Sequence, residues 1–166
     1  MSSLLDATSP CAVLSPGGVV LSNNRPVFKW EPLEGATGYR VLVADAANQE
    51  AATSGSLTSA TTQWTPSVPL RRGGIYTWVV IATVNDKEVT SPAATAPEMR
   101  FKLLDDGKVL ELNLLRRSTK SHLALGVFYA QEGMLVEAER EFQQLVNENP
   151  KSPVAIKLLR AVQSWR

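Results

Sequence analysis

The sequence has 166 residues, of which 44% are hydrophobic and 20% are charged, and its formal net charge at pH 7 is +1. This composition is typical of a folded globular protein with one mid-sized or two small domains, and it argues against a disordered chain. The single Cys and the single His exclude an internal disulfide and a structural zinc site, which needs about four ligands. The near-zero charge argues against a dedicated nucleic-acid binder, which would be clearly basic.

The residue types change near position 105, and this change divides the chain into two modules. Eight of the ten prolines lie before residue 98, where Gly, Thr, Ser and Val are also concentrated, whereas Leu, Glu, Arg, Gln and Ala dominate after the change. The first set favours strands and turns, and the second favours helices. We therefore expect an α+β protein with an all-β sandwich over residues 10–104 and an α-helical domain over residues 105–166.

Short apolar runs bounded by turn residues predict about seven strands in the first module. In Phe28-Lys29-Trp30 the two rings share one face of the strand, because side chains alternate. The sequence Asn85-Asp86-Lys87 predicts a hairpin turn. The expected strands cover residues 19–21, 26–30, 39–43, 61–64, 75–84, 88–90 and 98–104. So many short strands between turns predict a β-sandwich.

One segment of this module resembles a fibronectin type III domain. Leu70 precedes Tyr76 by six positions, as at the entry to the sixth strand of that family, and Trp30 matches the core Trp of the second strand. The resemblance covers about residues 13–104 and departs at Arg72-Gly73-Gly74, which replaces the usual Pro. It implies an immunoglobulin-like sandwich in which the Tyr76 hydroxyl bonds to an upstream backbone group, as a tyrosine corner does.

Amphipathic helices are predicted at both ends of the second module. The first covers residues 108–117, where apolar residues recur at helical spacing. The last begins at Ser152-Pro153, an N-cap followed by a proline in the first turn, and continues to the end of the chain. A helix pair lies between them, so we expect four helices in all.

The central helix pair resembles a single tetratricopeptide repeat over about residues 119–152. The residues that carry the motif are Leu125, Gly126, Tyr129, Ala138 and Phe142. The resemblance implies two antiparallel helices that approach closely at their small residues. The sequence departs from the family at His122, where a Trp is usual, and at Leu145, where a small Ala is usual.

One repeat cannot bury both of its faces, because such repeats normally stack in groups of about three or more. The surplus apolar surface must therefore pack on the sandwich or meet a partner. In tetratricopeptide proteins the ligand contacts come from the first helix, and here those positions are mixed and apolar instead of forming a basic clamp for a carboxylate. The candidate partner-binding residues are Lys120, Leu123, Val127, Ala130, Gln131, Arg116, Arg117 and Trp165.

No residue pattern predicts catalysis. Nucleophilic catalysis needs a nucleophile with a positioned base, and His122 lies at a packing position of the repeat. Cys11 is expected to be an inert or first-strand cysteine, and a lipid or redox site is the less favoured alternative. The basic cluster at residues 116–120 fits a helix C-terminus, where cations are favoured, and it could also contact phosphate or an acidic surface. We expect no enzyme, no cofactor and no bound metal.

The sequence favours a non-catalytic protein-interaction module, an accessory or scaffold subunit of a larger bacterial assembly that docks through its helical face. Two alternatives stay open: a soluble sensor portion of a membrane-associated signalling protein, and a carbohydrate-binding sandwich with Trp64 or Tyr39 as a stacking platform. No apolar run reaches the about 20 residues of a transmembrane helix, and the start, MSSLLDATSPCAVLSP, lacks the features of a signal peptide. We expect a protein partner, no nucleic acid, and a cytoplasmic location if Met1 is the native start, or a periplasmic one if the sequence is a fragment.

Overall fold

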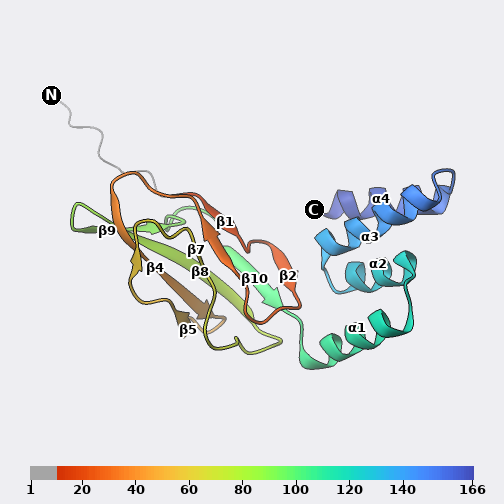
Figure 1. The fold of residues 1–166 in the computed structure, drawn as a ribbon, viewed down its shortest axis with the longest axis horizontal. Coiled ribbons are helices and arrows are strands. Elements are labelled where there is room, and N and C mark those ends of the chain that lie inside the picture. Colours follow the sequence, from red (N-terminus) through yellow and green to blue (C-terminus); the bar gives the residue numbers. More distant parts are fainter. Residues whose placement is uncertain (1–10) are drawn as a thin grey trace. The chain divides into compact units, whose positions relative to one another are not determined.

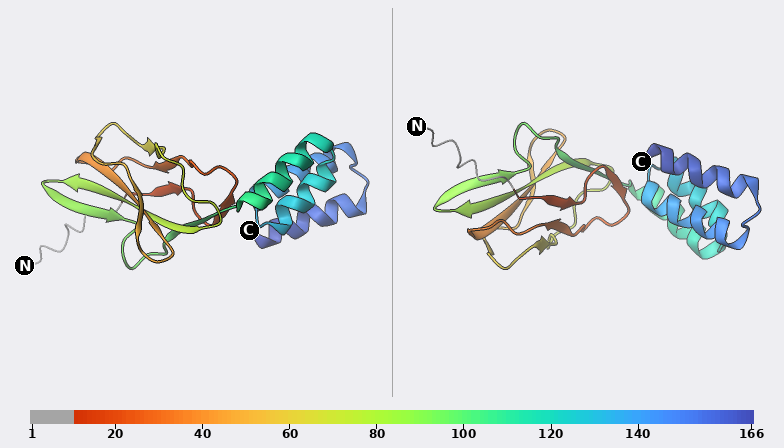
Figure 2. Two further views of the ribbon diagram at one scale, coloured as in Figure 1. Left: turned by 90° about the horizontal axis from the view of Figure 1, so that it is seen from below. Right: turned by 90° about the horizontal axis from the view of Figure 1, so that it is seen from above.

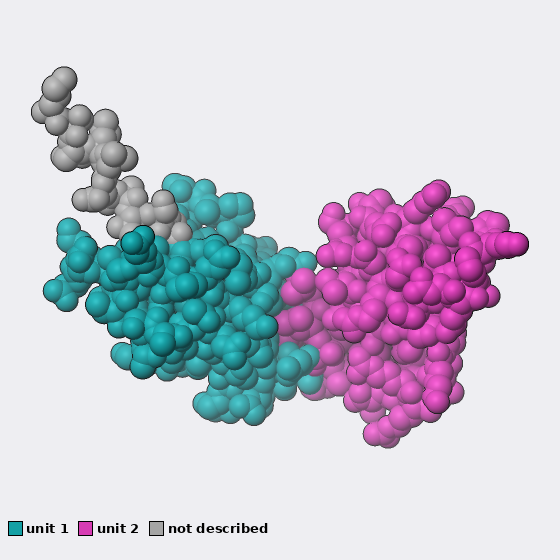
Figure 3. All heavy atoms as spheres, turned by 45° about the horizontal axis from the view of Figure 1, so that its top comes forward, with its two compact units in different colours: residues 1–18, 23–102 teal, residues 19–22, 103–166 magenta. Residues whose placement is uncertain are grey.

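The computed structural model describes residues 11–166 and divides into two compact units (Figure 3). The first unit contains the residues up to Gly18 and Asn23–Lys102, and the second contains Val19–Ser22 and Leu103–Arg166. The predicted start of the sandwich, at residue 10, lies outside the described residues. The assignment of Val19–Ser22 to the second unit is not predicted from the sequence, which places these residues in the sandwich.

The β-rich part of the chain contains two sheets (Figure 1). The smaller sheet has the strand order β1-β3-β7, and the larger has the order β2-β10-β8-β4-β5, with β6 beside β4 and β9 beside β8. The strands of the described residues are β1 (Val13–Ser15), β2 (Val19–Leu21), β3 (Phe28–Trp30), β4 (Ala36–Asp45), β5 (Glu50–Thr53), β6 (Leu57–Thr58), β7 (Gln63–Trp64), β8 (Ile75–Val84), β9 (Lys87–Ser91) and β10 (Met99–Leu103).

The expected seven strands are too few, because the structure also forms β1, β5 and β6. These strands are only two to four residues long, so none of them shows the alternation of apolar and polar residues that makes a strand visible in a sequence. The predicted hairpin is confirmed between β8 and β9. Asn85 and Asp86 both have positive φ, 51° and 61°, as the two central residues of a type I′ turn require.

Aromatic rings from strands of both sheets pack against one another in the sandwich. Phe28 of β3 lies 5.0 Å from the Trp78 ring of β8 and 5.7 Å from the Phe101 ring of β10, measured between ring centroids. The indole N–H of Trp78 donates to the Pro16 carbonyl at 2.7 Å, so this buried polar group is satisfied. Trp30 is buried in the same core, as predicted.

The tyrosine corner that the resemblance implies is present. The Tyr76 hydroxyl donates to the Arg71 carbonyl oxygen at 2.6 Å, and Leu70 is buried beside it. Gly73 has a φ of +81°, a left-handed conformation that glycine adopts without strain. A Cβ on Gly74 would lie 3.0 Å from the Tyr76 ring. The two glycines therefore allow the backbone to turn close to the Tyr76 ring, although the Pro that is usual in this loop is absent.

Four helices follow the sandwich, as predicted (Figure 2). They are α1 (Asp106–Ser118), α2 (His122–Gln131), α3 (Leu135–Glu148) and α4 (Pro153–Trp165). Side chains cap three of them: Asp105, Ser121 and Ser152 accept backbone N–H groups of α1, α2 and α4, which satisfies donors that have no partner within the helix. Within residues 11–166, no helix combines the length and the apolar character needed to cross a bilayer.

The second unit has its own core, and the closest helix contact in it is between α2 and α3. A Cβ on Gly126 of α2 would lie 2.4 Å from the Phe142 ring of α3, so only glycine fits there. Ala138 of α3 is completely buried. The buried cluster comprises Leu104, Leu112, Phe128, Tyr129, Met134, Ala138, Phe142 and Val162. Val20 packs against this cluster, which explains why its segment belongs to the second unit.

We expect Tyr76→Phe to lower the free energy of unfolding of the sandwich by about 1–2 kcal/mol, because it removes the hydroxyl and leaves the Arg71 carbonyl without its donor. Urea denaturation followed by tryptophan fluorescence measures the change. Thr58→Val is the matched control: it deletes a hydroxyl that is hydrogen-bonded to Thr61 at an exposed position, and its cost is expected to stay within about 0.5 kcal/mol. Equal stability of Tyr76→Phe and the wild type would contradict a structural role for the corner.

We expect Gly126→Ala to destabilise the helical unit by about 1–2 kcal/mol, because the overpacking against Phe142 exceeds the gain of about 1 kcal/mol in helix propensity. The test is a double-mutant cycle in which thermal unfolding is followed by circular dichroism at the helix signal. In the Phe142→Leu background the ring is absent, so the same Gly126→Ala change should cost less or become stabilising. An unchanged cost in that background would show that the contact with Phe142 is not the cause.

Candidate functional site

An apolar groove lies on the surface of the helical unit. It has a volume of about 230 Å³ and is formed by α2 and α4, with one ring from α3 between them. The residues that line it are Val127, Ala130, Gln131, Phe142, Leu158, Ala161, Val162 and Trp165. Gln131 is the one lining side chain with hydrogen-bonding amide groups, so the groove is suited to apolar side chains.

Helical periodicity explains how the two walls of the groove arise. Val127, Ala130 and Gln131 are three and four residues apart, so they share one face of α2. Leu158, Ala161, Val162 and Trp165 repeat the same spacing on α4, and that helix is held to the core by Val162, which is 1% exposed.

Two apolar side chains at the edges of the groove are exposed to solvent. The Trp165 side chain is 60% exposed and Val127 is 36% exposed. Large apolar side chains with that much exposure at the edge of a hollow are typical of interaction surfaces.

Four of the eight candidate residues from the sequence meet in this groove: Val127, Ala130, Gln131 and Trp165. Leu123 lies one turn before Val127 on α2 and is 43% exposed, but it does not line the groove. Lys120 lies between α1 and α2, also outside the lining.

The basic cluster before the repeat does not form part of the groove. The guanidinium of Arg116 donates to the Tyr129 hydroxyl, with Nη2 at 2.7 Å and Nε at 3.2 Å, and it lies 5.8 Å from the centre of that ring. Arg116 therefore links α1 to α2 inside the unit. Arg117 is exposed on α1 and is absent from the lining of the groove.

The sequence does not predict the α4 wall of the groove. It predicts an amphipathic terminal helix and places Trp165 among the candidate residues, but it does not join this helix to α2. The signal was the spacing of Leu158, Ala161 and Trp165 on a single face. The sequence does not show that this face lies beside α2, because the position of α4 depends on how α3 packs between the two helices.

His122 begins α2 and joins it to α3 through two carboxylates. Its Nδ1 lies 2.6 Å from a carboxylate oxygen of Glu141, and its Nε2 lies 3.3 Å from one of Glu148. The hydrogen bond to Glu141 raises the pKa of the imidazole above its usual value, and the nearby charges of both carboxylates act in the same direction. The side chain is thus a helix-to-helix link, and it lies outside the groove.

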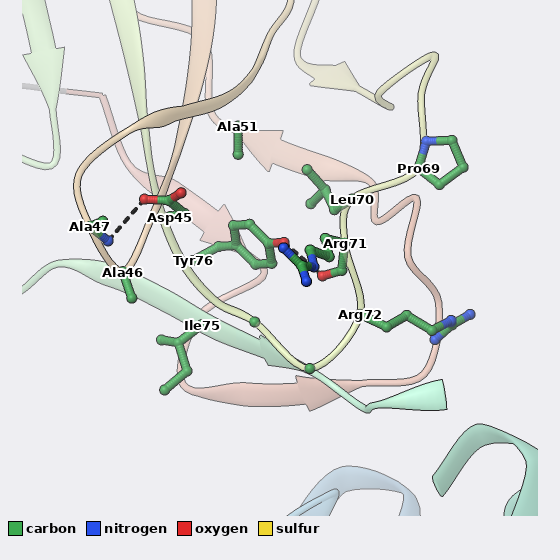
Figure 4. Close-up of a pocket in the computed structure, with 12 residues that line it drawn as sticks. Asp45, Ala46, Ala47, Ala51, Pro69, Leu70, Arg71, Arg72, Ile75 and Tyr76 are labelled. Atoms are coloured by element: carbon green, nitrogen blue, oxygen red, sulfur yellow. Dashed lines mark hydrogen bonds between the residues drawn. The ribbon is translucent and has the colours of Figure 1, made fainter. Parts of the chain in front are cut away.

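A larger hollow, of about 620 Å³, lies on the sandwich beside the tyrosine corner (Figure 4). Two of its polar side chains, Asp45 and Tyr76, already bind the chain's own backbone. Asp45 accepts from the backbone N–H groups of Ala47 and Gln49 at 2.9 Å, and Tyr76 donates to Arg71. Burial raises the pKa of the Tyr76 hydroxyl, and the charge of Asp45 adds to this. These groups shape the turns around the hollow instead of converging on a ligand.

Reactive side chains are also engaged elsewhere in the described residues. Cys11 is buried, and its Sγ lies 3.3 Å from the Ser91 hydroxyl. Residues 11–166 contain no cluster of three or more His, Cys, Asp or Glu side chains that could hold a metal ion. Tyr39 is 3% exposed and accepts the Leu33 N–H, while Trp64 is half-buried and stacks on Phe28.

Comparisons with known proteins give partial structural likeness. No protein-family model matches the sequence, and no curated protein matches it. A solved Fn3-like protein from Clostridium thermocellum is 21% identical over 57% of this chain and 94% of its own, with a TM-score of 0.38. CopC from Methylosinus trichosporium OB3b is 10% identical over 58% of this chain and 95% of its own, with a TM-score of 0.40.

We expect the pKa of His122 to lie above the ordinary value of about 6.5. The stabilisation from this link is then fully present below the unfolded-state pKa and is lost as the pH rises through the folded-state pKa. Because His122 is the single histidine, its imidazole NMR signal needs no further assignment. Glu141→Gln should lower the pKa more than the matched Glu148→Gln. A pKa at or below the ordinary value in the wild type would show that the link does not form.

Proposed function

We propose that this chain is a non-catalytic protein-interaction module that docks a partner through the groove between α2 and α4. The observation that carries the proposal is the exposed apolar lining of that groove, with Val127 and Trp165 at its edges. Large apolar side chains of this kind, when they lie around a hollow, mark sites of protein interaction.

The size and chemistry of the groove favour a protein partner over a small molecule. Ligand sites for small molecules have volumes of roughly 300–1,000 Å³ and place a few polar groups around the ligand. This groove has about 230 Å³, and Gln131 is its one amide side chain. Such a space suits one or two apolar anchor side chains of a larger partner.

We further propose that α2 and α3 form a tetratricopeptide-like repeat and that α4 stands where the first helix of a second repeat would lie. The close contact between Gly126 and Phe142 and the complete burial of Ala138 support this assignment, since these are the small and aromatic positions of the motif. In this interpretation the groove lies between two successive first helices. A partner segment would then bind in the groove between these two first helices.

The alternatives receive less support. A sugar-stacking platform needs an open aromatic face, whereas Tyr39 is buried and one face of Trp64 is covered by Phe28. A sensor or regulatory portion of a signalling protein would use the same groove, and it differs from a scaffold subunit in the identity of the partner. The proposed role as an accessory or scaffold subunit of a larger assembly therefore depends on finding that partner.

The test begins with a photoreactive amino acid in place of Trp165 in the source cells, and the crosslinked protein is then identified and purified. We expect Ala161→Phe to weaken its binding at least about tenfold in calorimetry, because the added ring fills the groove where an anchor would insert. Gln144→Phe places the same ring on an exposed position of α3 outside the groove and should leave binding unchanged. Equal binding by Ala161→Phe and wild type would overturn the proposed site.

A further inference from the structure

We propose that the partner segment is an acidic amphipathic helix, whose apolar face enters the groove and whose carboxylates face the cations of α4. This inference rests on the proposed docking function and adds the charge and shape of the partner. It is based on the distribution of charge within the helical unit, which is an observation independent of the apolar lining of the groove.

The two helices that form the walls of the groove carry no carboxylate side chain. From Asn149 to the end of the chain the sequence contains no Asp or Glu, and α2 contains none either. The cations of the same regions, all of them at or after Lys151, are Lys151, Lys157, Arg160 and Arg166. Both helices that form the walls of the groove are therefore free of negative charge, although the whole chain is nearly neutral.

The carboxylates of the unit that lie nearest are already paired with other groups. Glu139 binds Arg166, Glu132 binds Lys108 at 3.0 Å, and Glu141 and Glu148 hold His122. Glu132, Glu139, Glu141 and Glu148 are therefore engaged within the unit.

Two cations of α4, and Lys151 just before that helix, have no such partner. Within residues 11–166, no carboxylate forms an ion pair with Lys151, Lys157 or Arg160. Together with Pro153 and Ile156 these three line a second hollow, of about 400 Å³. Lys157 and Arg160 each lie next in sequence to a groove residue, Leu158 and Ala161. Consecutive residues of a helix point about 100° apart, so Lys157 and Arg160 lie outside the groove wall. A segment in the groove reaches these cations where it extends over the outer side of α4.

The geometry favours a helix as the bound segment. The groove has helical walls, and helices enter such grooves through apolar anchors spaced three, four and seven residues apart. The remaining positions of such a helix face away from the groove, where carboxylates meet the cations of α4. Complementary charge of this kind sets specificity and speeds association more than it adds affinity.

An anionic membrane surface is the competing partner for a basic helix with a terminal Trp. A helix that lies on a membrane needs a continuous protruding apolar face. In α4 the residues Ala155 and Val162 are 1% exposed and face the core, and the strongly exposed apolar side chains are Val154 and Trp165 near its two ends. The apolar surface between them is a hollow, which a side chain fills better than a flat bilayer does.

The test compares two labelled peptides of about 18 residues, or five helical turns, with the same leucine face and either Glu or Lys at all other positions. Fluorescence anisotropy with the full chain measures binding at ~50 mM and ~500 mM salt. We expect the Glu peptide to bind about tenfold more tightly than the Lys peptide at low salt, because a few exposed ion pairs each add a small amount. The difference should shrink at high salt.

Charge reversal tests the site. Lys157→Glu with Arg160→Glu should remove or invert the preference for the Glu peptide. Lys29→Glu with Lys102→Glu makes the same change in net charge at exposed positions of the sandwich, and it should leave the preference intact. Preservation of the preference in the α4 variant would overturn the assignment of these cations.

The remaining outcomes separate this inference from the docking proposal. Equal binding of both peptides, abolished by Ala161→Phe, would overturn the acidic partner and leave docking in the groove standing. Failure of both peptides to bind would overturn both proposals. Binding to phosphatidylserine vesicles that exceeds binding to the Glu peptide, and that is lost in the Lys157→Glu and Arg160→Glu variant, would overturn a protein partner in favour of a membrane surface.

Discussion

The contact of the Phe142 ring with the backbone at Gly126 determines the architecture of the helical unit. A side chain at that position would come within 2.4 Å of the ring, so its absence sets how closely α2 and α3 approach. Phe142 and Val162 belong to one buried cluster, and Val162 anchors α4. The same ring forms part of the groove lining. The proposed docking site is therefore a consequence of a missing side chain in the core beneath it.

The sandwich uses its polar groups in the opposite way, to hold its own loops. Tyr76 binds the Arg71 carbonyl, Trp78 binds the Pro16 carbonyl, and Asp45 holds the turn after β4. Groups that are committed to the backbone stabilise the fold but do not converge on a ligand. In the described residues, the exposed apolar hollow thus lies on the helices, and the sandwich supplies rigid packing.

Features that depend on neighbouring residues could be predicted from the sequence. The Asn85-Asp86 turn and the capped helix starts follow from local conformational preferences. The bond of Tyr76 and the packing of Gly126 come from motifs whose spacing carries their geometry. These predictions agree with the structure because each one depends on a short segment of chain.

Features that depend on segments far apart could not be predicted in this way. β5 and β6 form because β4 offers them a partner, not because of a pattern of their own. Val20 joins the helical core, although it reads as a sandwich strand in the sequence. The groove combines Val127 with Trp165, and neither helix alone reveals it. The candidate positions on α2 are mixed and apolar, so they give no sign of a charged partner. The unpaired cations Lys157 and Arg160 are on α4.

The distribution of charge in the helical unit supports the proposal of an acidic partner. Exposed ion pairs contribute little to stability, so the pairs Glu139–Arg166 and Glu132–Lys108 add little to the free energy of folding. Their main effect is to engage two carboxylates that could otherwise pair with other cations. Within the described residues, Lys157 and Arg160 stay unpaired and line a second hollow on α4, where a segment that extends from the groove over the outer side of this helix would meet them. An apolar hollow selects for anchor side chains, and the field beside it selects against basic segments. In the proposed complex, specificity would come from the cations of α4 with which no carboxylate of the unit forms an ion pair.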